Sequence, residues 1–308
     1  MSLLPLRHPP TGNTAARDGI VLVLFVRRSH VDLAAQAGDF FDALRAYIGE
    51  DTLNHIVAAE QWKPLTTRRF NSARKRMSAA AATGLPNEFV LMKGPGSEYE
   101  VGEYAFSYIG NEIGTEGNEE RASSIEVWLP TEKAEERGLE TFVEDILALA
   151  AHVPFSSGYC SMAINYEAAD VAKVERQLTP ALGLRHPGFD LHNTSVTQLQ
   201  IGDHVRGAYW LTLLGPEVLE ALGKDVDGLC EALEEPDITV HELDHGAAIV
   251  AGDELRPGDV NAGDRLPLTR KVAALLAPVT HTPTWGAIGF RVEDPMTRYL
   301  DWLRRHLD

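Results

Sequence analysis

The residues with the clearest chemical potential form the pentapeptide His241-Glu242-Leu243-Asp244-His245. It fits the pattern H-E-x-x-H, in which two histidines bind zinc and the glutamate acts as general base. That chemistry requires an α-helix, because only there do positions i and i+4 direct both imidazoles toward one metal ion. On a β-strand, His241 and Glu242 would point to opposite faces and could not share a metal.

The residues around this pentapeptide favour a β-hairpin over a helix. Strand-forming segments flank it on both sides, at residues 238–240 and 247–250, and Asp244-His245-Gly246 is typical of a turn. We therefore predict a hairpin over residues 236–253 that turns at residues 244–246. A zinc-dependent hydrolase that uses His241, Glu242 and His245 is retained as the alternative.

Other signatures of catalysis are missing from the sequence. It contains no G-x-S-x-G nucleophile motif and no phosphate-binding loop. The paired carboxylates Glu119-Glu120 and Glu234-Glu235 lie within acidic runs, which is typical of a solvated surface and not of an acid–base dyad. We expect no catalytic residue, no cofactor and no bound metal.

Acidic residues are unevenly distributed along the 308-residue chain. The formal net charge of −17 divides into +2 for residues 1–100, −10 for residues 101–200 and −9 for residues 201–308. A field of this sign repels phosphate backbones and attracts cationic partners, so we expect no nucleic-acid binding. Two segments concentrate the acids: a loop with Glu112, Glu116, Glu119 and Glu120, and a helical region with Asp225, Asp227, Glu231, Glu234 and Glu235.

The composition is that of a globular protein of the cytoplasm. Apolar residues make up 44% of the chain, which is enough for a proper core. Residues 1–11 have no apolar signal region, and no run approaches the length of a membrane span. Cys160 and Cys230 are far apart and lack ligand spacing, which fits a reducing compartment.

The apolar patterning predicts an α+β fold of mixed or antiparallel sheets with packed helices. Residues 19–28 are expected to form a strand that is buried on both faces. Further strands are expected at residues 104–109, 124–129, 159–166, 196–200, 209–214 and 285–292, and helices at residues 66–77, 139–150, 168–178, 225–235 and 266–276. A turn-rich segment near residue 183 suggests two halves of similar size, residues 1–183 and 184–308.

Short apolar and turn motifs recur through residues 186–278. They are His186-Pro187-Gly188-Phe189-Asp190, the run from Arg206 to Gly215, Leu222-Gly223, the strand from Gly246 to Gly252, Pro257-Gly258-Asp259-Val260-Asn261 and the helix end from Ala273 to Pro278. This set resembles the type VI secretion immunity proteins that are cognate to toxins of the VRR-NUC and related restriction-endonuclease-like kinds. The chain departs from the family at Lys224, where a second glycine is usual.

The resemblance implies a cytoplasmic inhibitor that binds and blocks a nuclease toxin with a basic cleft, without catalysis of its own. It also implies that the two halves form one continuous immunity domain. Five motif residues are then expected to determine the fold: Trp210, Pro216, Gly223, Gly258 and Asp259. The two acidic segments are the candidate toxin contacts, with the loop preferred because loops reach into clefts. An acidic scaffold with an unrelated partner remains a third possibility.

Overall fold

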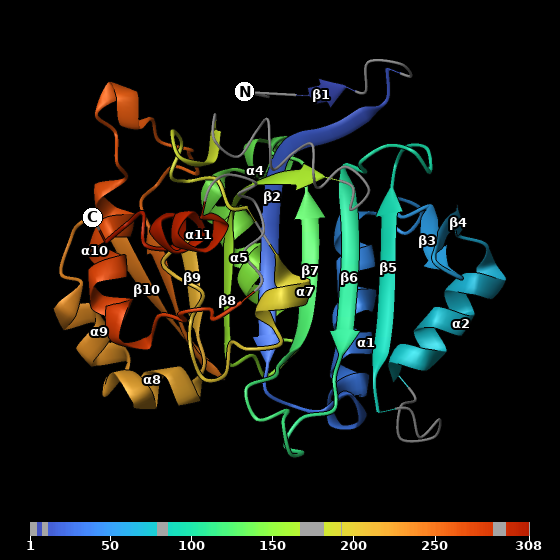
Figure 1. Ribbon diagram of the computed structural model, residues 1–308, viewed down its shortest axis with the longest axis horizontal. Coiled ribbons are helices and arrows are strands. Elements are labelled where there is room, and N and C mark those ends of the chain that lie inside the picture. Colours follow the sequence, from blue (N-terminus) through green and yellow to red (C-terminus); the bar gives the residue numbers. More distant parts are fainter. Residues whose placement is uncertain are drawn as a thin grey trace.

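One antiparallel β-sheet extends through the molecule (Figure 1). The computed structural model describes residues 5–7, 12–78, 86–166, 182–191, 193–285 and 294–307. The strands follow the order β10-β11-β9-β8-β2-β7-β6-β5-β3-β4, and β1 pairs with β2 outside this path. Every ladder between these strands is antiparallel. The predicted α+β fold is therefore confirmed, with antiparallel pairing.

Strands from both ends of the chain contribute to this sheet. They are β1 (Pro5–Arg7), β2 (Thr14–Val26), β3 (His55–Ala58), β4 (Gln61–Pro64), β5 (Glu88–Gly94), β6 (Tyr104–Gly110), β7 (Ser123–Leu129), β8 (Ser157–Tyr166), β9 (Leu211–Leu214), β10 (Ile238–Leu243) and β11 (Gly246–Ala251). Hydrogen bonds join β8 to β9, where Tyr159 lies opposite Thr212. The sheet thus continues from the first predicted half of the chain into the second.

The long strand β2 lies at the centre of the sheet, between β7 and β8. Side chains alternate between the two faces of a strand. Ile20, Leu22 and Leu24 belong to the cluster that packs under α1, whereas Val21 and Val23 belong to a cluster on the opposite face. Because both faces are covered, residues 20–26 of this strand are all apolar, as the sequence indicated.

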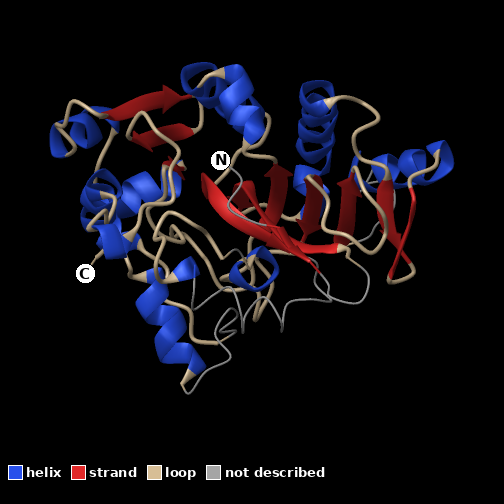
Figure 2. Ribbon diagram, turned by 90° about the horizontal axis from the view of Figure 1, so that it is seen from above, coloured by secondary structure: helices blue, strands red, loops and turns tan. Residues whose placement is uncertain are grey.

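Helices cover both faces of the sheet. They are α1 (His30–Ile48), α2 (Thr67–Ser78), α4 (Glu132–Arg137), α5 (Leu139–Ala150), α7 (Thr194–Thr197), α8 (Pro216–Leu222), α9 (Val226–Ala232), α10 (Pro267–Leu276) and α11 (Pro295–Leu303), with 3-10 turns η3 (Val260–Ala262) and η4 (Ala277–Val279). Figure 1 shows α7 and α11 in front of the sheet and α1 behind it, and Figure 2 shows the same two layers from above. No helix among the described residues has the length and apolarity needed to span a bilayer.

Helix α1 shows how the sequence places this layer. Leu33, Ala37, Phe41, Leu44 and Ile48 recur at helical spacing and are all buried against the sheet. The opposite side of the helix is exposed and includes the acidic residues Asp32, Asp39 and Asp42. The amphipathic pattern therefore fixes which side of α1 packs on the sheet.

Two predicted strands differ from the structure. Residues 196–200 do not form a strand, because the N–H groups of Val196 and Thr197 both bond to the carbonyl of Asn193 and close the single helical turn α7. The strand expected from residue 209 begins at Leu211, because the N–H of Tyr209 bonds to the Thr212 hydroxyl in a local turn. The helix expected at residues 168–178 and residues 286–292 of the last strand lie outside the described residues.

Candidate functional site

The pentapeptide from His241 to His245 lies in a β-hairpin, as predicted. Strands β10 and β11 pair with His241 opposite Ala248 and Leu243 opposite Gly246. His241 and Glu242 are neighbours on a strand and point to opposite faces, and His245 lies in the turn. The zinc-hydrolase alternative is therefore wrong, because the helix that would aim both histidines at one metal is replaced by a hairpin.

A glycine is required at the start of β11. Gly246 has a φ of 130°. It lies so close to β9 that a Cβ at this position would be 2.0 Å from the carbonyl oxygen of Leu214. Only glycine allows both the positive φ and this contact. The glycine at position 246 therefore fixes the turn, and this turn is incompatible with the helix that zinc binding would require.

The first acidic segment forms the loop between β6 and β7, at one end of the sheet (Figure 1). Its four carboxylates are all exposed: Glu112, Glu116, Glu119 and Glu120. None of them forms an ion pair with another described residue. Hydrogen bonds from its own N–H and from that of Gly117 lower the pKa of the Glu119 carboxyl. The loop therefore presents uncompensated negative charge to solvent.

The base of this acidic loop is hydrogen-bonded to the segment between β2 and α1. The N–H of Ile113 donates to the Ser29 hydroxyl at 2.9 Å, which in turn donates to the Ile113 carbonyl at 3.2 Å. Arg27 donates from Nη2 to the Glu119 carbonyl at 2.6 Å. Contacts of this kind pre-organise a loop, so less conformational entropy is lost when a partner binds.

The second acidic segment surrounds helix α9. Asp225 caps this helix by accepting a hydrogen bond from the Gly228 N–H at 2.8 Å, and Glu235 pairs with Lys271 Nζ at 3.1 Å. Its other three acids are exposed: Asp227, Glu231 and Glu234. Figure 1 shows α9 beside β10 at the far end of the sheet, so the two acidic segments form separate surfaces.

Trp210 lies in the core and not on a surface. Its side chain is 6% exposed, and its ring stacks on Phe142 of α5 with 6.3 Å between centroids. The indole Nε1 donates to the Gly252 carbonyl at 3.2 Å, which satisfies its one polar group.

The other motif residues occupy helix ends and turns. Pro216 opens α8, and Gly223 ends it in the left-handed conformation with a φ of 65°. Gly258 also has a positive φ of 66°, and Asp259 caps η3 through the Asn261 N–H. The Arg185 guanidinium lowers the pKa of the Asp259 carboxyl to about 2. These contacts support local backbone geometry.

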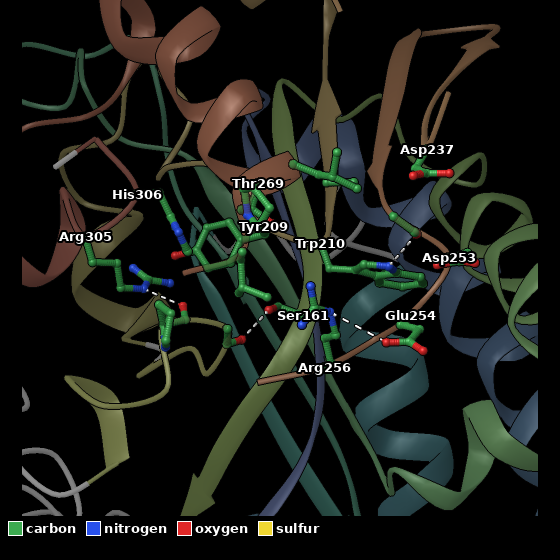
Figure 3. A pocket seen from close by; sticks show the side chains of 17 residues that line it. Ser161, Tyr209, Trp210, Asp237, Asp253, Glu254, Arg256, Thr269, Arg305 and His306 are labelled. Carbon is green, nitrogen blue, oxygen red and sulfur yellow. Dashed lines mark hydrogen bonds and ion pairs between the residues drawn. The ribbon is translucent and has the colours of Figure 1, made fainter. Parts of the chain in front are cut away.

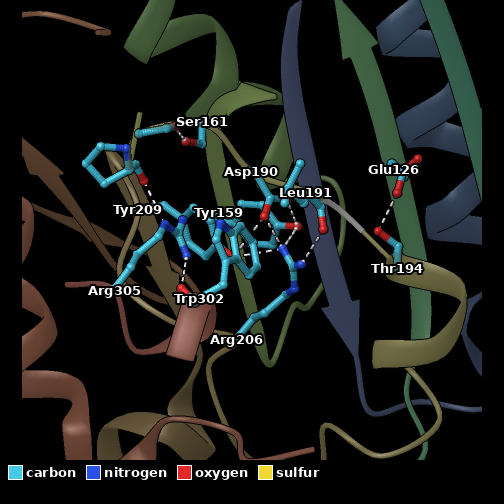
Figure 4. Close-up of polar contacts among 12 residues, drawn as sticks. Glu126, Tyr159, Ser161, Asp190, Leu191, Thr194, Arg206, Tyr209, Trp302 and Arg305 are labelled. Carbon is cyan, nitrogen blue, oxygen red and sulfur yellow. Dashed lines mark hydrogen bonds and ion pairs between the residues drawn. The ribbon is translucent and has the colours of Figure 1, made fainter. Parts of the chain in front are cut away.

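A buried polar network joins β8 to two loops of the second half (Figure 4). Arg206 and Asp190 form an ion pair whose side chains are 1% and 0% exposed. The same guanidinium donates to the hydroxyls of Tyr159 and Tyr209, both at 2.8 Å, and to the Leu191 carbonyl at 2.9 Å. Sequence patterns did not predict this network, because its members are separated along the chain and Asp190 and Arg206 come from segments without helical or strand periodicity.

A cavity of about 390 Å³ lies beside this network (Figure 3). Two of its polar side chains make structural contacts: the Ser161 hydroxyl donates to the Gly188 carbonyl at 3.0 Å, and Arg305 Nε donates to the Pro187 carbonyl at 2.7 Å. Burial and the neighbouring Arg305 lower the pKa of His306 well below its usual range. Among the described lining residues, no hydrogen bond joins a nucleophile to a base, which nucleophilic catalysis would require.

Comparison with known proteins gives one family and one fold. A family model described as type VI immunity for VRR-NUC matches residues 39–306. No curated protein matches the chain. A solved structure described as Pseudomonas aeruginosa T6SS protein PA0821 is similar, with a TM-score of 0.81 and 19% identity, over 99% of this chain and 87% of that chain. At this identity the similarity shows a shared fold.

Proposed function

The chain belongs to the family of type VI immunity proteins for VRR-NUC, and from this premise we propose that it binds a VRR-NUC toxin in the cytoplasm and blocks it without catalysing a reaction. The family match covers most of the chain, including both predicted halves. The hairpin at His241 removes the main enzymatic alternative. The protein then acts by occupying a surface of the toxin.

The observation that carries the proposal further is the exposed acidic loop between β6 and β7. A nuclease must bind phosphate backbones, so its substrate cleft carries positive charge. Carboxylates held on a fixed loop can occupy the positions of the phosphates and attract the cleft from a distance. Glu116, Glu119 and Glu120 have this exposure, and the backbone beneath them is anchored to Arg27.

The acidic segment around α9 is the second candidate for toxin contact. Two of its carboxylates, Asp225 and Glu235, are engaged in capping and in an ion pair. The four carboxylates of the β6–β7 loop form no ion pair with another described residue, which favours this loop as the first contact. Net charge alone does not separate the two segments, because both are strongly acidic.

Binding of the purified chain to the VRR-NUC protein encoded in its gene neighbourhood tests the proposal. We expect a stable complex and a loss of nuclease activity in proportion to the complex formed. If the two proteins do not associate at micromolar concentration and low salt, the proposed function is wrong.

Charge reversal then locates the contact. Glu116→Lys, Glu119→Lys and Glu120→Lys together should slow association at low salt by about tenfold or more and reduce its salt dependence. The matched control combines three substitutions at exposed positions of α4 and α5, which are Glu136→Lys, Glu140→Lys and Glu144→Lys. It changes the net charge equally and should slow association much less. Equal rates for the loop variant and the wild type would rule out the loop and direct the same test to Glu231, Glu234 and Glu235.

A further inference from the structure

An apolar patch on the front face of the sheet lies uncovered beside the acidic loop. In β5, Val90 and Met92 are buried in the core under α1, so Phe89 and Leu91 point to the opposite face. The Phe89 side chain is 49% exposed, although it lies within a strand and not in a turn. An exposed aromatic ring of this kind contributes little to folding and is typical of a contact surface.

Among the described helices, those that cover this face extend no further than β7 (Figure 1). The Thr194 hydroxyl of α7 donates to the Glu126 carboxylate, and the Ser124 hydroxyl donates to Gln198 at 3.1 Å. Glu126 and Ser124 belong to β7, so α7 lies over this strand. Beyond it, none of the helices that the structure describes lies in front of β6 or β5 (Figure 1).

A row of paired residues crosses this boundary. Ser124 of β7 lies opposite Ile109 of β6, and Ile109 lies opposite Phe89 of β5. Accessibility rises along the row, because Ser124 is buried, Ile109 is half-buried and Phe89 is exposed. Phe89 and Ile109 therefore form one small apolar surface, which we call the Phe89 patch.

The Phe89 patch adjoins the base of the acidic loop. Ile109 is two residues before Asn111, where the loop begins, and the N–H of Glu112 donates to Asn87 Oδ1 at 2.9 Å. Asn87 is in turn the second residue before Phe89 in the chain. This hydrogen bond from the Glu112 backbone to the Asn87 side chain holds the start of the loop next to the segment that carries Phe89.

A second exposed aromatic residue lies toward the other end of the loop. The Trp285 side chain is 48% exposed, and its carbonyl accepts from Gln200 at 3.1 Å. Two residues further, the N–H of Gly202 donates to the Glu120 carbonyl at 3.0 Å. Hydrogen bonds therefore link one end of the acidic loop to the segment of Phe89, through Asn87, and the other end to Trp285, through residues 200–202.

We infer that the Phe89 patch is the apolar anchor of the toxin-binding surface and that the acidic loop is its charged rim. Specific interfaces combine an apolar centre, often with an aromatic residue, with a polar rim that excludes water. Charge complementarity selects the occupant, because the four rim carboxylates fit a basic protein surface. The inference rests on the proposed function and adds that the toxin places an apolar side chain against Phe89, next to its cationic groups.

Substitution of the exposed ring tests this inference in the full-length protein. Phe89→Thr removes the ring and keeps a strand-forming residue. Its matched control is Tyr99→Thr, which removes a ring that is 70% exposed in the segment between β5 and β6, at the opposite end of β5. Binding of each variant to the VRR-NUC protein is measured by surface plasmon resonance at two salt concentrations, with melting temperatures measured in parallel.

We expect Phe89→Thr to weaken toxin binding by about 30-fold or more, as truncation of a hot-spot residue does. The loss should be in the dissociation rate and should persist at high salt, whereas reversal of the loop charges acts on association and fades with salt. Tyr99→Thr should bind like the wild type. If Phe89→Thr lowers the melting temperature, Phe89→Leu retains the apolar contact in part and should bind with intermediate affinity.

The outcomes separate this inference from the proposed function. If the wild type does not bind the toxin, the proposed function fails. If the wild type binds and Phe89→Thr binds equally well, only the inference is overturned. A wild-type dimer in gel filtration that Phe89→Thr dissociates, with unchanged affinity for the toxin, would show that the patch joins two copies of this chain and would also overturn the inference.

Discussion

Replacing Asp190 with asparagine is expected to destabilise the fold more than any single change to a surface ion pair. Asp190 is fully buried, and its carboxylate accepts from the Arg206 guanidinium and from the hydroxyls of Tyr159 and Tyr209. Asparagine preserves the shape and one acceptor oxygen but removes the negative charge. The buried Arg206 cation would then lose its counter-charge in a region of low dielectric constant.

The size of the effect follows from this burial. Removing one partner of a buried ion pair costs about 3–5 kcal/mol, because the remaining charge is desolvated and unpaired. The pair between Asp42 and Arg74 offers a comparison nearer the surface, because the Asp42 side chain is 52% exposed and accepts three hydrogen bonds of 2.6–3.1 Å from Arg74. Asp42→Asn should cost about 1 kcal/mol or less, because water solvates both groups. The two variants should therefore differ by several kcal/mol.

Urea unfolding followed by tryptophan fluorescence measures both losses. The double variant Asp190→Asn/Arg206→Met is the decisive control, because it removes both buried charges and should be more stable than Asp190→Asn alone. A loss below about 1 kcal/mol for Asp190→Asn would refute the argument that this pair compensates a buried charge.

Two further predictions concern stability. Burial lowers the pKa of the His281 imidazole to about 4, and the nearby His204 and Arg206 contribute to this lowering. In the unfolded chain the same imidazole is protonated below about pH 6.5. The free energy of unfolding should therefore be highest above about pH 6.5 and should fall by about 3 kcal/mol as the pH drops to about 4. His281→Leu should flatten this dependence in urea unfolding at several pH values, and His152→Gln, at an exposed position, should not. Trp210→Ala should cost about 3–5 kcal/mol, because it removes a buried ring that packs on Phe142. An unchanged melting temperature for Trp210→Ala together with lost toxin binding would contradict this core role.

Helices and strands could be predicted from the sequence where the conformational preferences of their residues agree with the tertiary packing around them. Residues 20–26 of strand β2 are all apolar because this part of the strand is covered on both faces, and the β10–β11 hairpin has strand-forming flanks and a turn that only Gly246 permits. Helix α7 shows the opposite case. Val196 and Thr197 are β-branched and favour a strand, but a helical turn anchored on Asn193 places Gln198 against β7. Tertiary contacts decided the conformation there.

The negative charge of the candidate site could be predicted from the sequence, but its shape could not. Acidic residues at positions 112–120 are evident in the sequence, and the structure shows them exposed on an anchored loop. The exposure of Phe89 was not predictable, because an apolar residue in an alternating strand ordinarily faces a core. It depends on where the cover provided by α7 ends, which no local pattern encodes. The Arg206–Asp190 pair was missed for the same reason, since its partners lie in loops that the tertiary fold brings together beside β8.

The position of β2 at the centre of the sheet has a consequence for the timing of protection. Both neighbours of β2 are synthesised long after it, because β7 begins at Ser123 and β8 at Ser157. At about 5–20 residues per second, a ribosome needs on the order of 10 s to extend the chain from Val26 to the end of β7. Contacts this distant in sequence also slow folding itself, because the entropy of closing a long loop opposes them. Under the proposed function, protection at any moment would therefore depend on copies of this chain whose synthesis has already passed β8.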